Sequence, residues 1–129
     1  MTTAEPRTAT SPAQVGELWG EAFNRGDIAG MMAQYADDCA FVSGPGQVIR
    51  GKDAIRADLE GFLGLKGHIT FEPPSIVEYG EIALVHARWT LKGTGPEGPL
   101  EMSGYTSEVV HRQPGGAWQY VIDDPGMGL

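Results

Sequence analysis

The sequence predicts a single α+β domain in which three short helices pack against a curved antiparallel sheet. Helical periodicity is confined to the first half of the chain, and the second half consists of strand-like segments separated by Gly/Pro turns. Helices followed by a meander of strands are typical of the α+β class. A length of 129 residues, with 41% hydrophobic residues, is enough for one domain with its own core. We expect the sheet and the helices to enclose a pocket for a small, mostly apolar molecule.

The first helix is predicted to begin at Pro12 after a Ser11 cap, and Gln14 completes a capping-box pattern. Gly26 suits a left-handed helix end, and Asp27 can cap a second, shorter helix. A third helix is expected near residues 53–63. The three apolar stripes are Val15, Leu18, Trp19, Ala22 and Phe23; Ile28, Met31, Met32 and Tyr35; and Ile55, Leu59, Phe62 and Leu63.

The predicted strands cover residues 39–43, 48–50, 68–78, 82–92, 100–112 and 118–124. Turn signals separate them at Gly44–Gly46, at residues 79–81, at residues 93–99 and at residues 113–116. Because proline cannot donate to a strand ladder, Pro73 and Pro74 make the segment 68–78 an edge strand or a bulged one. We find no internal repeat and no second domain.

Charge and composition exclude several classes of function. Nine Lys and Arg against 17 Asp and Glu give a formal charge of -8, which disfavours nucleic acids and anionic membranes as partners. Residues 1–10 read as a flexible tail without an apolar run, and residues 11–129 as the domain. No segment approaches the ~20 apolar residues that a membrane span needs. With Cys39 as its one cysteine the chain fits a reducing compartment, so we expect it in the cytoplasm.

Hairpin symmetry predicts which strand residues share a face. If a turn is centred near Gly95–Glu97, partner numbers sum to about 194; for the turn near 114–116 they sum to about 230. In this register His86 lies across from Glu108, and Arg88 across from Thr106. One face then carries His86, Arg88, Thr106, Glu108, Tyr120 and Asp124, and the other carries Val85, Ala87, Trp89, Tyr105, Val109 and Val121.

The polar face supplies candidates for acid–base chemistry. His86 beside Glu108 could move a proton, Arg88 could hold a carbonyl or enolate oxygen, and Asp124 could be a base if burial raises its pKa. Each has a structural alternative: a hydrogen-bonded strand histidine, an internal ion pair of Arg88 with Glu108 or Asp124, and a turn at Asp124–Pro125.

The remaining candidates would contact a ligand or form the core. They are Trp19, Phe23, Phe41, Ser43, Thr106, Trp118 and Tyr120. The aromatic ones fit core packing as well as a ligand platform, and Ser43 fits turn chemistry beside Gly44. The histidines at 68, 86 and 111 lack metal-ligand spacing, so no metal site is predicted. We also expect no cofactor, because the sequence carries no phosphate loop or dinucleotide fingerprint.

Four segments in register resemble the nuclear transport factor 2-like superfamily, which includes ketosteroid isomerase and the broad bacterial SnoaL-like group. They are Ala22–Asp27, Tyr35–Val42, Gly51–Arg56 and Gly116–Pro125. The resemblance implies a cone-shaped fold. The position of the isomerase base falls at about Ser43, and that of its oxyanion-hole tyrosine at about Trp19. Neither residue can perform those roles, so we expect no steroid isomerisation by the familiar residues.

From the resemblance and the polar face, the sequence predicts an enzyme that moves protons on a hydrophobic carbonyl compound, as an isomerase, cyclase or dehydratase does. The alternatives are a non-catalytic ligand-binding domain and a dimeric accessory module. The superfamily often pairs through its sheet, and an outer face with Trp89 and Tyr105 fits a homodimer.

Overall fold

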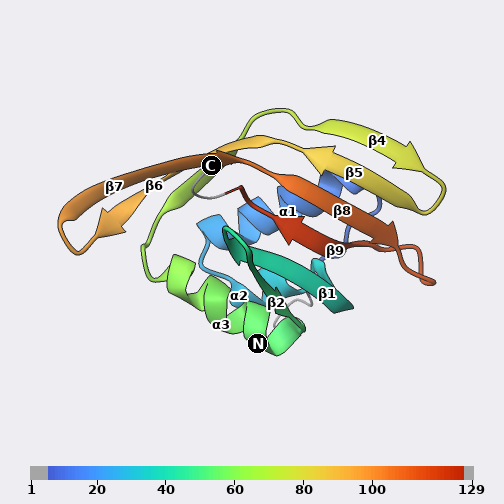
Figure 1. Ribbon diagram of the computed structural model, residues 1–129, viewed down its shortest axis with the longest axis horizontal. Helices are drawn as coiled ribbons and strands as arrows, with labels where there is room; N and C mark the ends of the chain where they lie inside the picture. Colours follow the sequence, from blue (N-terminus) through green and yellow to red (C-terminus); the bar gives the residue numbers. More distant parts are fainter. Residues whose placement is uncertain (1–5, 127–129) are drawn as a thin grey trace, which may run out of the picture.

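The computed structural model describes residues 6–126, which form three helices and nine strands (Figure 1). The helices are α1 (Pro12–Asn24), α2 (Ile28–Met32) and α3 (Lys52–Leu63). The strands are β1 (Tyr35–Gly44), β2 (Gln47–Arg50), β3 (His68–Phe71), β4 (Ser75–Tyr79), β5 (Ile82–His86), β6 (Arg88–Gly95), β7 (Gly98–Tyr105), β8 (Ser107–Arg112) and β9 (Trp118–Asp124). This is the predicted α+β order of helices and strands, with a mixed rather than purely antiparallel sheet.

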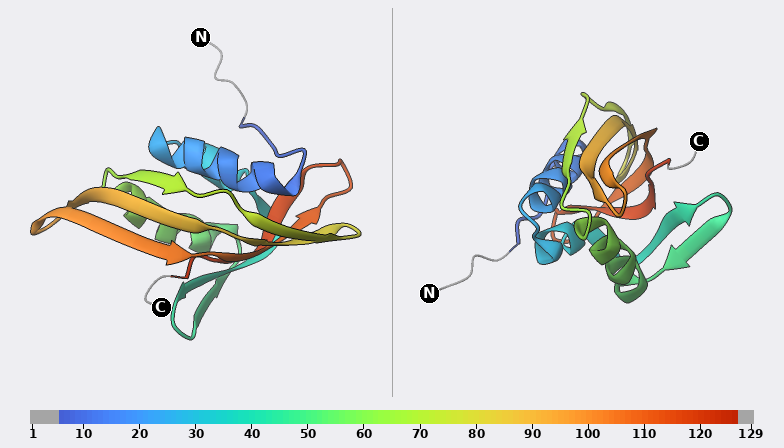
Figure 2. Two further views of the ribbon diagram at one scale, coloured as in Figure 1. Left: turned by 90° about the horizontal axis from the view of Figure 1, so that it is seen from above. Right: turned by 90° about the vertical axis from the view of Figure 1, so that its left-hand side faces the viewer.

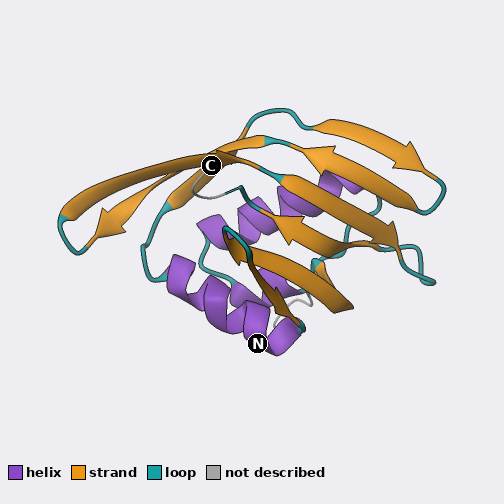
Figure 3. Cartoon of the chain, in the orientation of Figure 1, coloured by secondary structure: helices purple, strands orange, loops and turns teal. Residues whose placement is uncertain are grey.

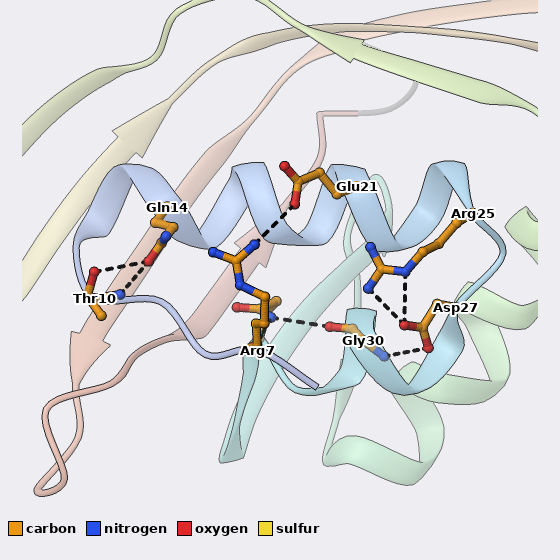
Figure 4. Close-up of polar contacts among 8 residues, drawn as sticks. Arg7, Thr10, Gln14, Glu21, Arg25, Asp27 and Gly30 are labelled. Carbon is orange, nitrogen blue, oxygen red and sulfur yellow. Dashed lines mark hydrogen bonds and ion pairs between the residues drawn. The ribbon is translucent and has the colours of Figure 1, made fainter. Parts of the chain in front are cut away.

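Side chains cap the N-termini of both α1 and α2 (Figure 4). The Ser11 hydroxyl accepts from the backbone N–H of Gln14, and the Gln14 side chain accepts from the N–H of Thr10 at 2.7 Å. In a standard capping box the Gln14 side chain would accept from the N–H of the cap residue Ser11. Here it accepts from the N–H of the preceding residue, Thr10. After Gly26, at φ 72°, Asp27 caps α2 by accepting from the N–H of Gly30 at 2.9 Å, as predicted.

A contact with the last strand precedes the predicted domain boundary at residue 11. Ala9 is fully buried, and its carbonyl accepts from the N–H of Trp118 at 2.9 Å, as part of an isolated antiparallel bridge. The prediction of a flexible tail over residues 1–10 is therefore wrong at Ala9, because a small residue fits against the last strand there. Residues 1–5 lie outside the described part of the chain.

The strands form two connected sheets (Figure 3). The larger one has the order β2-β1-β9-β8-β5-β4, and the smaller one has the order β3-β6-β7. All neighbouring strands are antiparallel except β1 and β9, the first and last strands, which are parallel. The sheet wraps around the helices, which lie on its concave side (Figure 2).

Two of the predicted long strands are interrupted at facing positions. Segment 82–92 breaks at Ala87, and segment 100–112 breaks at Thr106. The N–H of Thr106 donates to the Ala87 carbonyl at 2.8 Å, while the N–H of Ala87 donates to the Thr106 hydroxyl at 2.9 Å. Because a side-chain oxygen replaces a backbone acceptor, the ladder bends here without leaving the Ala87 N–H unpaired.

The core fills the space between the concave face and the helices. Helix α1 packs against β3, β5 and β9, and α3 against β1 and β2. The largest fully buried side chains include Tyr35, Phe41, Met31, Ile55 and Leu59. None of the helices within residues 6–126 combines the length and apolar character that crossing a bilayer requires.

Candidate functional site

An apolar cavity opens between the helices and the concave face of the sheet. It has a volume of about 50 Å³ and is partly open to solvent. Its apolar lining comes from α1, α3 and four strands or their ends: Trp19, Phe23, Phe41, Leu59, Phe62, Ile69, Phe71, Trp89, Leu91 and Pro125. Its polar lining consists of Thr106, Glu108, Tyr120 and Asp123. An apolar cavity with a few convergent polar groups is a typical site for a small organic molecule.

Aromatic rings form much of the cavity wall. Trp19 stacks on Phe23 with centroids 5.5 Å apart and meets Phe71 edge-on at 6.2 Å. Trp89 is held by its indole N–H, which donates to the Pro125 carbonyl at 2.7 Å. These contacts fix the ring planes, so the wall is preorganised for a flat or ring-containing ligand.

Asp123 lies at the polar end of the cavity, where it accepts hydrogen bonds from one hydroxyl and one carboxyl. The Tyr35 hydroxyl donates to its Oδ2 at 2.6 Å, and the Trp19 indole N–H donates to the Tyr35 hydroxyl at 3.1 Å. Tyr35 is fully buried and Asp123 is 5% exposed. This is a charge-assisted hydrogen bond, of the short kind expected when the acceptor is ionised.

Glu108 is the second buried carboxyl and is hydrogen-bonded to Asp123. The Thr106 and Tyr120 hydroxyls also bond to Glu108. Both hydroxyls favour the Glu108 carboxylate, whereas Asp123 favours its protonated form, so Glu108 is the donor towards Asp123. Tyr35 and Glu108 thus both donate to the Asp123 carboxylate, while the Thr106 and Tyr120 hydroxyls bond to Glu108.

Burial sets the protonation of this pair. It raises the pKa of Asp123 to about 6, although the hydrogen bonds from Tyr35 and Glu108 act in the opposite direction. Burial, followed by the charge of Asp123, raises the pKa of Glu108 well above its ordinary value. The same two causes raise the pKa of Tyr35 well above its ordinary value. Near neutral pH the two carboxyls therefore share one proton, with the charge on Asp123 and the proton on Glu108.

A bulge in β9 brings the two carboxyls face to face. Val110 pairs with Tyr120, as predicted, but Val109 pairs with Ile122, so Val121 is an extra residue in the strand. Beyond the bulge Glu108 pairs with Asp123 instead of the predicted Ile122. Asp123 therefore points into the cavity, and the sequence-based choice of Asp124 is wrong by one position.

The other predicted hairpin also slips by one residue. Val85 pairs with Glu108 and Arg88 with Tyr105, so partner numbers sum to 193 and not to 194. Thr106, Glu108 and Tyr120 face the cavity as expected, together with Trp89 from the face expected to lie opposite, and Val85 from that same face is buried. His86 and Arg88 are exposed on the outer face, so the prediction that they share a pocket face with Glu108 is wrong.

The contacts of His86 and Asp124 match their structural alternatives, whereas Arg88 pairs at the surface with Glu72 and not with Glu108 or Asp124. His86 Nδ1 lies 3.0 Å from the Thr106 carbonyl, at the bend of the sheet. Arg88 forms a 3.5 Å ion pair with Glu72 and lies over the Tyr105 ring. Asp124 accepts from the N–H of Gly126 at 2.9 Å, in a turn around Pro125.

Of the remaining residues predicted to contact a ligand, some line the cavity and others lie away from it. Trp19, Phe23 and Phe41 line the cavity without filling it. Trp118 is buried beside Ala9, away from the cavity lining, and the Ser43 hydroxyl lies 3.5 Å from the Gln47 carbonyl in the β1–β2 turn. Sequence reasoning missed Tyr35 and Asp123. The adjacent Asp123–Asp124 pair was the available signal, since in a strand one of two consecutive residues must face inwards.

No three His, Cys, Asp or Glu side chains gather as a metal-binding group anywhere between residues 6 and 126. The polar groups that line the cavity are the carboxyls of Glu108 and Asp123 and the hydroxyls of Thr106 and Tyr120.

The fold is shared with many solved structures. A nuclear transport factor 2-like protein from Salmonella enterica serovar Typhimurium superposes with a TM-score of 0.76 at 19% identity, over 91% of this chain and 89% of that one. A protein from Novosphingobium aromaticivorans, named as a candidate scytalone dehydratase, gives 0.76 at 16% identity, over 86% and 77%. At such identities the likeness concerns the fold alone.

A function-unknown protein from Mycobacterium tuberculosis gives a TM-score of 0.75 at 19% identity; 86% of this chain covers 66% of that one. No curated protein matches the chain. The family model of the SnoaL-like domain matches residues 17–120. This range includes most of the sheet and all three helices, except for the start of α1. The chain therefore belongs to the SnoaL-like domain family.

Proposed function

We propose that this protein is an enzyme that removes water from a hydrophobic hydroxy-carbonyl compound, with Asp123 as base and Glu108 as acid. The supporting observation is the pair of buried, hydrogen-bonded carboxyls that share one proton at the polar end of an apolar cavity. Paired titratable groups whose surroundings separate their protonation states are typical of acid–base catalysis. Two structural neighbours are named as candidate dehydratases, which agrees with this class of reaction.

The two carboxyls supply and take up every proton that the reaction moves. The Asp123 carboxylate takes the proton from the carbon next to the carbonyl, and the electrons of that C–H bond form the new C=C bond. The C–O bond to the hydroxyl breaks, and the hydroxyl leaves as water with the proton of Glu108. Asp123 then carries a proton and Glu108 a charge, and transfer across their hydrogen bond restores the starting state. Tyr35 and Tyr120 hold the carboxyls in position for both steps.

Catalysis by this pair is tested with aryl and polycyclic β-hydroxy ketones, whose enone products are followed by ultraviolet absorbance. We expect Asp123→Asn and Glu108→Gln to lower kcat/KM by about 100-fold or more. Glu101→Gln, at an exposed position of β7, makes the same chemical change away from the cavity and should retain the parental rate.

Two results would separate the neighbouring possibilities. Incorporation of solvent deuterium next to the carbonyl without loss of water would identify an isomerase that uses Asp123 alone. Unchanged turnover in both variants would contradict the assignment. The alternative of a non-catalytic binding domain rests on the apolar lining, and it predicts tight binding of these ketones by native mass spectrometry without any turnover in the parent protein.

A further inference from the structure

A second cavity lies on the other side of Glu108, between the start of α1 and the strands β5 and β8. Its volume is about 60 Å³. Ala13, Gly16 and Glu17 of α1 form one wall, and Val85 and Val110 lie in the opposite wall. Figure 2 shows α1 lying along the concave side of the sheet.

The two cavities have a common partition. Phe71, Glu108 and Tyr120 line both of them. Glu108 is 6% and Tyr120 is 2% exposed, so each of these polar groups is almost enclosed and yet borders two spaces. The carboxyl that donates the proton in the proposed reaction can therefore be approached from a side that the apolar cavity does not occupy.

The second cavity has polar residues at both exposed and buried positions of its lining. Glu17 and Glu72 are exposed residues of that lining, whereas Val110 is fully buried. Gly16 borders the Tyr120 hydroxyl: a Cβ atom there would lie 3.8 Å from its oxygen, in ordinary van der Waals contact, so only a larger side chain would fill the space beside it. Carboxylates at the mouth, with a hydroxyl and a carboxyl at the inner end, supply the two to four partners that a bound water needs.

We propose that this second cavity is a water-binding passage that connects Glu108 and Tyr120 with solvent, separately from the cavity that admits the organic substrate. Its role rests on the proposed function, because dehydration releases a water molecule next to Glu108 while the organic product still fills the apolar cavity. The aromatic rings of that cavity offer the water no hydrogen-bond partners. The passage lets water leave, and lets protons exchange, without release of the product.

The passage is tested by filling it from α1. Gly16→Leu places an apolar side chain in front of the Tyr120 hydroxyl, and Ala13→Leu fills the same wall if the first variant does not fold. The matched control is Gly61→Leu in α3, where a Cβ atom meets nothing within 4 Å. All three changes introduce the same good helix former into a helix.

The first readout is the exchange of the Glu108 proton, followed by infrared spectroscopy after rapid mixing with D₂O at pH 5. The carbonyl band of a protonated carboxyl shifts on deuteration, and its loss in Glu108→Gln assigns it. We expect Gly16→Leu or Ala13→Leu to slow this exchange by about tenfold or more, as closure of a solvent path does, and Gly61→Leu to leave it unchanged. Parental exchange rates in both filled variants would overturn the proposal.

The second readout does not depend on the protonation of Glu108. In the parent protein we expect nuclear Overhauser effects between water and the methyl groups of Val110, which is fully buried yet lines the passage. They should disappear in the filled variants, and their absence from the parent would refute the passage. A missing carboxyl band with intact water contacts at Val110 would instead contradict the proposed function and leave the passage standing.

Discussion

At the scale of single residues, the buried carboxyl pair opposes stability. A charged carboxyl that is only 5% exposed, as in Asp123, is costly even with good donors, and here it shares a hydrogen bond with Glu108, a second buried carboxyl. A fold selected for stability alone would place apolar side chains at Glu108 and Asp123. Such a cost at a cavity is a common mark of a functional site.

The pair makes stability fall as pH rises. The folded protein keeps the Asp123 proton up to a pKa of about 6, whereas the unfolded chain releases it near 3.8. Between these values the folded state binds more protons, so the titration of Asp123 lowers the free energy of unfolding by about 3 kcal/mol as pH rises. Glu108, whose pKa is also raised, acts in the same direction.

We expect Asp123→Asn to lose this decrease, because the amide is neutral on both sides of the transition. Urea unfolding at intervals between pH 4 and 8 would measure it. The exposed Glu101→Gln serves as the control and should reproduce the parental curve. A parental slope that is flat, or that rises over this interval, would mean that Asp123 is ionised at low pH in the folded protein.

At the scale of elements, the site depends on two irregularities in otherwise regular strands. The bend at Ala87 and Thr106 separates the two sheets, and the bulge at Val121 aligns Asp123 with Glu108. His86, predicted as a catalytic residue, instead contacts the Thr106 carbonyl at the bend.

The bend gives a direct prediction for Thr106→Val, which keeps the shape of the side chain and removes its hydroxyl. The Ala87 N–H then loses its acceptor, and Glu108 loses a donor. We expect a loss of about 1–3 kcal/mol in the free energy of unfolding, typical of a buried N–H left unpaired. Thr94→Val, at an exposed position of β6, should cost much less in the same thermal or urea measurement.

Element types were predictable from sequence, and strand register was not. Helix caps and apolar stripes are local signals, and Ser11, Gly26 and Asp27 lie where those signals put them. Facing residues, in contrast, depend on single-residue counts across turns. One uncounted residue at Val121 and a slip of one in the longer hairpin were enough to exchange Asp124 for Asp123 and to turn His86 and Arg88 outwards.

At the scale of the whole molecule, the outer face of the large sheet carries an apolar row. Val77 pairs with Leu84, Leu84 with Val109, and Val109 with Ile122, so the row crosses β4, β5, β8 and β9 (Figure 3). Trp89, predicted for this face, points into the cavity instead, while Tyr105 is exposed as expected. We propose that a second copy of the chain covers this row, because continuous apolar surface on a sheet favours a partner.

The proposed homodimer is tested by sedimentation velocity at micromolar concentration. We expect the parent to sediment as a dimer and Leu84→Lys to sediment as a monomer, because the charge would be buried in the centre of the interface. Leu100→Lys, at an exposed apolar position on β7 away from the row, should remain dimeric. A monomeric parent would contradict the proposal.

The parallel pairing of β1 with β9 joins the two ends of the fold at the site itself. Tyr35 and Asp123, which share the 2.6 Å hydrogen bond, are 88 positions apart in the sequence. A contact that spans so much of the chain forms late in folding, since most of the loop must be ordered first. Partly folded chains therefore have neither the charged acceptor nor the polar end of the cavity. We expect the polar end of the cavity to be complete only when β9 has paired with β1.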